Sequence, residues 1–168
     1  VWDSPIASSI LTALICTLGI LFIFLIGKKL YGEEEGLIAA FFMAFIPFIF
    51  LNSNFLLTDV PVVTLMGISF YLLLFHEKNN YLFFSGIFFS LAVLMKFTSA
   101  LLAVPFLLYF LINKVSTKKI IIFSLGSSTI LIPYFLFSWF KFGNPIYPFI
   151  LGSTMVSDIN TSWNFYFL

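Results

Sequence analysis

Long apolar runs separated by short polar segments are the feature of this sequence that most constrains its fold. Six such runs lie at residues 5–27, 37–54, 60–76, 81–95, 98–113 and 120–140. A helix of about 20 apolar residues spans the hydrocarbon core of a membrane. Because 61% of the residues are hydrophobic and only 9% are charged, the composition lies outside the range of a water-soluble globular domain. The sequence predicts a protein that crosses a membrane several times.

The runs predict helices rather than strands. Inside lipid the backbone must satisfy its own hydrogen bonds, which only helices and closed barrels achieve. Barrel strands alternate polar and apolar residues, and this chain contains uninterrupted runs such as GLIAAFFMAFIPFIF. We therefore predict an all-α, polytopic transmembrane bundle of about six spans over residues 1–140. Residues 141–168 are predicted to begin a loop on the outer face.

The distribution of lysines predicts the orientation in the membrane. All eight basic residues are lysines, and six of them occupy one alternate set of connections: Lys28, Lys29, Lys78, Lys114, Lys118 and Lys119. Lysine-rich short loops stay on the cytoplasmic side. The other set of connections, which holds Lys96 and Lys141, is then on the outer face together with Asp59.

Several classes of function find no support in the sequence. The net charge of +1 gives no basic stripe for nucleic acid. Cys16 is the single cysteine, so neither a disulfide nor a cysteine metal site forms within this chain. His76 has no second ligand at metal-binding spacing, and no glycine-rich phosphate loop, GxSxG or HExxH motif occurs.

Two charged residues stand out at the ends of apolar runs. Thr58 and Asp59, followed closely by Pro61, form a good helix start. Asp59 is therefore interpreted either as a helix cap, which is a structural role, or as a carboxylate of a functional site on the outer face. Lys96 interrupts the run SGIFFSLAVLMKFTSALLAVPFLLYFL, which is too long for one comfortable span and too short for two. We expect two short helices that meet near Lys96, the alternative being one long tilted helix with Lys96 buried.

Smaller signals concern helix ends and helix contacts. Glu33, Glu34 and Glu35 precede an apolar run, and acids at that place favour a helix N-terminus. Four glycines within the runs are predicted to allow close contact between helices: Gly19, Gly67, Gly86 and Gly126.

The order of several segments resembles a known family. These segments are KKLYG with its acidic continuation, GLIAAFFMAFIPFIFLNSNFLLTDVPVV, SGIFFSLAVLMKFTSALLAVP and WFKFGNPIYPF. Together they are similar to the polytopic glycosyltransferases of the protein O-mannosyltransferase and aminoarabinose-transferase type, whose fold is called GT-C. The resemblance covers residues 5–149 approximately.

The resemblance implies an activity and a set of site residues. Such enzymes move a sugar from a polyprenyl-phosphate carrier to a protein, lipid or glycan on the outer or lumenal face. Asp59 matches an acidic position of the second outer loop and is the expected catalytic residue. Lys96 matches a basic position that faces the carrier phosphate, and Asn144 and Tyr147 of FGNPIYP are expected to bind substrate.

Other expectations from the resemblance concern the metal and the extent of the chain. Many relatives use a divalent cation, but one outer acid cannot hold a metal alone, so no metal ligand is assigned and metal dependence stays open. The main catalytic acid of the family lies in the first outer loop, which would precede Val1. The chain is therefore expected to be an internal fragment of a longer protein.

Two other functions remain open. A transporter or flippase would place ionisable residues at the middle of the membrane, where these runs carry almost none. A membrane scaffold subunit would use its charges only to set its orientation. The sugar and the acceptor are not identified, and for the membrane we favour the plasma membrane of a prokaryote over the endoplasmic reticulum.

Overall fold

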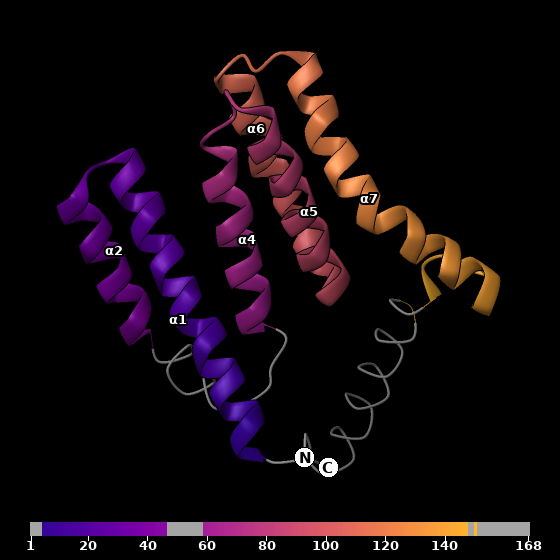
Figure 1. Ribbon diagram of the computed structural model, residues 1–168, viewed down its shortest axis with the longest axis horizontal. Helices are drawn as coiled ribbons and strands as arrows, with labels where there is room; N and C mark the ends of the chain where they lie inside the picture. The colour runs from indigo at the N-terminus through magenta and orange to yellow at the C-terminus, as the bar shows by residue number, and fades with distance from the viewer. Residues whose placement is uncertain (1–4, 47–58, 148–149, 151–168) are drawn as a thin grey trace, which may run out of the picture. The chain divides into compact units, whose positions relative to one another are not determined.

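The computed structural model describes residues 5–46, 59–147 and 150, and every regular element in these residues is helical. The elements are α1 (Pro5–Leu30), α2 (Glu33–Phe45), α4 (Asp59–Leu73), α5 (Asn79–Met95), the short 3-10 helix η1 (Phe97–Leu102), α6 (Ala103–Ile112) and α7 (Thr117–Phe142) (Figure 1). The prediction of an all-α fold is confirmed. The chain divides into two compact units, residues 1–129 and 130–168.

Prolines and acids mark the places where helices begin. Pro5 and Pro61 lie in the first turn of a helix, where the missing backbone N–H has no partner to lose. Pro105 lies in the first turn of α6, directly after η1. α2 begins at Glu33, and its first turn holds all three predicted acids. The preceding Gly32 has a φ of 137°, a backbone conformation that favours glycine.

Pro133 lies inside α7, close to the boundary between the two units. A proline in a helix cannot donate to the carbonyl four residues earlier, and here that carbonyl belongs to Thr129, the last residue of the first unit. The local weakness of the helix therefore coincides with the point where one unit ends and the next begins.

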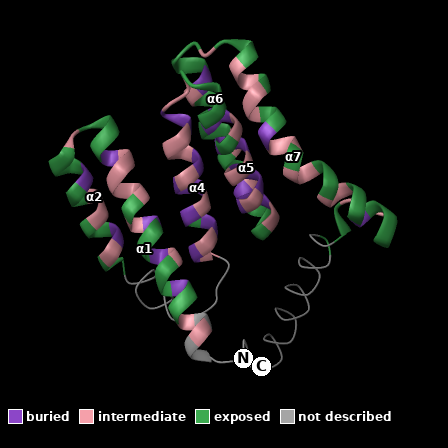
Figure 2. Ribbon diagram, in the orientation of Figure 1, coloured by how far each residue is buried: buried purple, intermediate pink, exposed green. Residues whose placement is uncertain are grey.

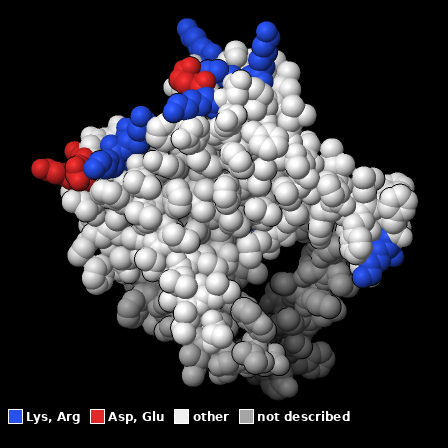
Figure 3. All heavy atoms as spheres, in the orientation of Figure 1, with Lys and Arg blue, Asp and Glu red and all other residues white. Residues whose placement is uncertain are grey.

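Within the first unit the helices run alternately in opposite directions (Figure 1). The turns that carry the six predicted inner lysines consequently share one end. On the face drawn in Figure 3, the visible charged side chains of this unit lie along that end, with a largely uncharged surface below it. Asp59 begins α4 and Lys96 follows α5, so both lie at the opposite end. The assignment of these ends to the inner and outer faces stays a prediction.

Buried residues concentrate on α4 and α5, which pack side by side (Figure 2). Two serines join them reciprocally: Ser69 Oγ donates to the carbonyl of Ser85 at 2.8 Å, and Ser85 Oγ donates to the carbonyl of Ser69 at 2.7 Å. Ser90 Oγ donates to the carbonyl of Ser127 in α7 at 3.0 Å. Such hydrogen bonds between helices compensate polar groups that lie away from water.

Glycines set the closest approaches between helices. A Cβ on Gly86 would lie 2.1 Å from the carbonyl oxygen of Phe123, and one on Gly126 would lie 2.1 Å from that of Phe83. The predicted close contact is therefore confirmed for both. For Gly67 the prediction is wrong, because the nearest atom would be an ordinary 3.6 Å away.

The predicted close contact is also confirmed for Gly19, whereas the close contacts at Gly27 and Gly36 were not predicted. A Cβ on Gly19 would lie 2.7 Å from Thr64 Oγ1. Gly27 and Gly36 bring α1 and α2 together, with a Cβ on Gly27 only 2.7 Å from the Cα of Gly36. These two glycines lie near the lysine and glutamate turn rather than at the middle of an apolar run.

In the part of the chain that the structure describes, two helices are long and apolar enough to cross a membrane: Ser9–Leu30 and Thr117–Phe142. Three further apolar helical segments are shorter: Asp59–Leu73, Asn79–Met95 and Phe97–Ile112. Short spans are accommodated by local thinning of the bilayer at modest cost. The outward faces are strongly apolar, with Leu101 75% and Ile112 77% exposed, which suits lipid better than water. The second half of the predicted span 37–54 lies outside the described residues.

Candidate active site

Asp59 and Lys96 form an ion pair between α4 and α5, in which Lys96 Nζ donates to Asp59 Oδ1. Asp59 begins α4 and Lys96 follows the last residue of α5, so the antiparallel packing of the two helices brings the two residues to the same end. Their side chains are 35% and 43% exposed. The two charged residues that the sequence singled out at this end are therefore brought together at a partly open surface.

The backbone at Lys96 fixes where its side chain begins. α5 ends at Met95, and Lys96 is extended with φ −149° and ψ 108° before η1 starts at Phe97. Its N–H donates to the carbonyl of Ala92 at 3.0 Å. Its own carbonyl accepts hydrogen bonds from the N–H of Ser99 at 2.9 Å and from Ser99 Oγ at 2.6 Å. The helix break confirms the two-helix interpretation, and the single long helix is wrong.

Asp59 is the first residue of α4 as described. A carboxylate at a helix N-terminus is stabilised by the helix dipole, typically by about 0.3–1 kcal/mol at an exposed place. This position explains why an acid is tolerated beside apolar runs, and the ion pair adds a second reason. The predicted contribution of Thr58 to the helix start lies outside the described residues.

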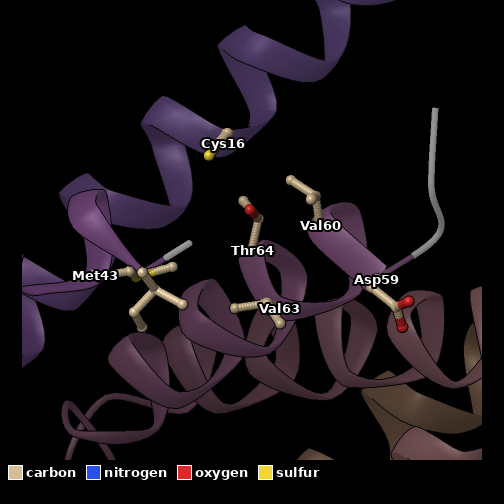
Figure 4. A pocket seen from close by; sticks show the side chains of 7 residues that line it. Cys16, Met43, Asp59, Val60, Val63 and Thr64 are labelled. Carbon is tan, nitrogen blue, oxygen red and sulfur yellow. The ribbon is translucent and has the colours of Figure 1, made fainter. Parts of the chain in front are cut away.

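A small apolar cavity of about 160 Å³ adjoins Asp59 (Figure 4). Residues of α1, α2 and α4, together with Ile46 directly after α2, line it: Cys16, Met43, Ile46, Asp59, Val60, Val63 and Thr64. Thr64 Oγ1 donates to the carbonyl of Ile15 at 3.0 Å and so ties α4 to α1. In Figure 4 the Asp59 carboxylate points away from Cys16 and Thr64. One residue therefore contributes its stem to an apolar cavity and its charge to a polar pair.

With this arrangement in view, comparison with protein families gives a decisive match. The family model of dolichyl-phosphate-mannose-protein mannosyltransferases matches residues 3–139, most of the chain. The chain belongs to this family. The match confirms the resemblance seen in the sequence and the GT-C type of fold. Searches of curated proteins and of solved structures find no match.

As a member of this family, the chain is of the integral membrane glycosyltransferase type. The matched range contains both members of the ion pair, Asp59 and Lys96, and all the residues that line the cavity. Asn144 and Tyr147 lie beyond it. The first two predicted site residues therefore lie within the matched range, and their roles stay a prediction.

Asn144 and Tyr147 belong to the second unit of the chain. Asn144 Oδ1 accepts a hydrogen bond from the N–H of Ile146 at 3.0 Å, which stabilises a local turn. The ring of Tyr147 stacks on that of Phe142, with centroids 4.8 Å apart. Both side chains have these local structural roles, and their predicted substrate contacts stay a prediction.

The polar residues at the lysine-rich end form a separate network. His76 Nδ1 lies 3.2 Å from the hydroxyl of Tyr109, and His76 Nε2 lies 3.3 Å from Glu77 Oε1. Lys119 Nζ donates to Glu77 Oε2 at 2.9 Å. This hydrogen bond, together with the charges of Lys119 and His76, lowers the pKa of Glu77. In the described part of the chain no three His, Cys, Asp or Glu side chains are grouped to hold a metal ion.

Sequence reasoning missed two elements of the candidate site. Ser99 holds the backbone of Lys96, and a serine three residues after a helix break is a common signal for such a turn. The cavity was missed because its walls come from three helices. Apolar residues that line a cavity and those that face lipid look alike in a sequence.

Proposed function

We propose that this chain forms the outer-face part of a glycosyltransferase that takes a sugar from a polyprenyl-phosphate carrier. The acceptor is a hydroxyl of a protein, lipid or glycan. The observation that carries the proposal is the Asp59–Lys96 ion pair, which lies at the lysine-poor end of a chain of this family. In such a pair the ammonium can bind an anion, and the adjacent carboxylate can accept a hydrogen bond from a hydroxyl.

Lys96 is the proposed binding group for the carrier phosphate. During transfer the bond between the sugar C1 and the phosphate oxygen breaks, and the lipid phosphate leaves with the electron pair. Negative charge grows on that phosphate, and a fixed ammonium stabilises it. A lysine is a compact positive charge suited to phosphate. The hydrogen bonds of Ser99 to the backbone of Lys96 would hold its side chain at the site.

Asp59 is the proposed catalytic carboxylate. Lys96 uses Oδ1, and a carboxylate has a second oxygen that accepts a hydrogen bond. That oxygen suits a hydroxyl of the acceptor or of the sugar. As the new bond from the acceptor oxygen to C1 forms, the hydroxyl proton passes to a base. Binding of the carrier phosphate to Lys96 would loosen its hold on Asp59 and make the carboxylate a stronger acceptor.

The cavity beside Asp59 suits the lipid part of the donor. Cavities of about 150 Å³ lined by aliphatic side chains stay dry and bind apolar molecules the size of benzene. The cavity here has about 160 Å³ and is lined mainly by aliphatic groups. It has room for one branched five-carbon unit of a polyprenyl chain whose phosphate reaches the ion pair.

The alternative functions lack such an observation. A transporter is expected to hold paired ionisable groups at mid-membrane, whereas Asp59 and Lys96 lie at helix ends. A scaffold subunit would need the pair only for folding. We further propose that the active face is the extracytoplasmic side of a prokaryotic plasma membrane, because the lysine-poor turns lie at the end that holds the pair.

Transfer of labelled sugar by full-length protein in membranes tests the proposal. We expect Asp59→Asn and Lys96→Met each to reduce the rate at least 100-fold, the range typical for loss of one charge-stabilising group. Lys114→Gln, which removes an exposed lysine at the other end, is the matched control and should keep full activity. Membrane insertion and thermal unfolding in detergent are measured on all three variants. Full activity of both site variants would disprove the assignment.

A further inference from the structure

Two lysines at the end opposite the proposed active site lie on aromatic rings. Lys29 Nζ is 4.8 Å from the ring centroid of Phe75, and Lys78 Nζ is 5.3 Å from that of Tyr81. The two rings contact each other, with centroids 5.4 Å apart. The end of α1 and the turn between α4 and α5 therefore present two ammonium groups around one aromatic pair.

Neither ammonium is neutralised by a carboxylate within the described residues. Lys28 pairs with Glu33 at 3.1 Å, and Lys119 pairs with Glu77 at 2.9 Å. Glu77 precedes Lys78 in the sequence but is engaged by Lys119. Within the described residues the ammonium groups of Lys29 and Lys78 have ring contacts alone, so either can turn to an anion without breaking an ion pair.

An apolar groove of about 390 Å³ begins at the same tyrosine. Leu72 of α4 and four residues of α5 line it: Asn80, Tyr81, Phe84 and Phe88. Phe84 is 52% exposed. Tyr81 both lines the groove and carries Lys78, so a charged region and an apolar region adjoin at one residue. Asn80 adds an amide that donates hydrogen bonds where the two regions meet.

We propose that this surface binds one anionic glycerophospholipid of the leaflet at the lysine-rich end. An acyl chain lies along Phe84 and Phe88, and the headgroup phosphate reaches Lys29 and Lys78. The lysines exchange a ring contact for a charge-assisted hydrogen bond to phosphate, which is the stronger interaction. A zwitterionic lipid gains less because its headgroup carries a positive group that the same lysines repel. The site is independent of the proposed transferase activity.

Native mass spectrometry of the full-length protein in detergent tests this proposal. The protein is titrated with phosphatidylglycerol or, for comparison, with phosphatidylcholine. We expect tighter binding of phosphatidylglycerol, and an apparent dissociation constant about tenfold or more higher in the double variant Lys29→Gln/Lys78→Gln, since each lysine near a membrane surface adds substantially to anionic-lipid binding. Phe84→Ala should weaken binding of this lipid with both lysines in place.

The matched control is Lys114→Gln/Lys118→Gln, which removes two exposed lysines from the same end of the molecule. This control should bind phosphatidylglycerol as the parent does. Equal losses in both double variants would mean attraction to net charge alone and would overturn the proposal. Unchanged binding in Lys29→Gln/Lys78→Gln, or equal affinity for the two lipids, would also overturn it. Since transferase activity is not measured, the result does not depend on the proposed function.

Discussion

Single glycines decide how closely α5 and α7 approach. The predicted consequence is that Gly86→Ala destabilises the protein, because the added methyl group would meet the carbonyl of Phe123 at 2.1 Å. Forcing extra volume into a packed contact costs about 1–3 kcal/mol. Thermal unfolding in detergent measures the effect. Gly67→Ala is the control, since its methyl group would meet its nearest neighbour at an ordinary 3.6 Å. Equal stability of the two variants would contradict the packing described.

At the residue scale the sequence predicted charges better than small residues. Asp59 and Lys96 stand out because a charged side chain beside an apolar run costs free energy unless it lies at a membrane interface or in a polar site. Gly67 was wrongly assigned to a close contact, and Gly27 and Gly36 were not predicted. A glycine in the sequence shows only that this position has no side chain. Which backbone it faces depends on how the helices pack, and that packing is not written in the local sequence.

At the element scale, the turn between α4 and α5 is tied to the start of α7 by Lys119 and Glu77. The pKa of Glu77 is lowered from its ordinary value of 4.5, mainly by the hydrogen bond from Lys119. A carboxyl whose pKa is lower in the folded state stabilises that state above its ordinary pKa. The contribution is lost as the pH falls through the lowered value.

The predicted test is the difference in unfolding temperature between Lys119→Gln and the parent protein. The variant should be slightly less stable at pH 7, and the difference should shrink as the pH falls below 4.5. The effect is small because Glu77 is exposed and water screens the pair. A difference that grows with acidification would show that Lys119 acts through some other contact.

Element boundaries followed from the sequence where a charge or proline marked them. The break between α5 and η1 falls at Lys96, and α2 begins at the three glutamates. The length of the helices was harder to predict. Apolar runs continue past helix ends, as between Leu73 and His76, because an apolar side chain carries no signal that ends a helix.

At the scale of the whole molecule, the account predicts the membrane orientation. In a background of the full-length protein in which Cys16 and any other cysteine are replaced by serine, single cysteines replace Lys114 and Lys141. A thiol reagent that cannot cross membranes should label the Lys141→Cys protein in intact cells. It should label Lys114→Cys only after the membrane is opened, because lysine-rich turns stay inside. The reverse pattern would place the Asp59–Lys96 pair on the cytoplasmic side.

The central claim is that Asp59 and Lys96 act on substrate and do more than hold two helices together. Transferase activity of the charge-exchanged variant Asp59→Lys/Lys96→Asp tests it most directly. Exchange keeps an ion pair between α4 and α5 but puts the ammonium where the acceptor needs a carboxylate. The account predicts a protein that inserts and unfolds like the parent yet has lost at least 100-fold in rate. Activity restored to near the parental level, with both single changes inactive, would show that the pair is structural.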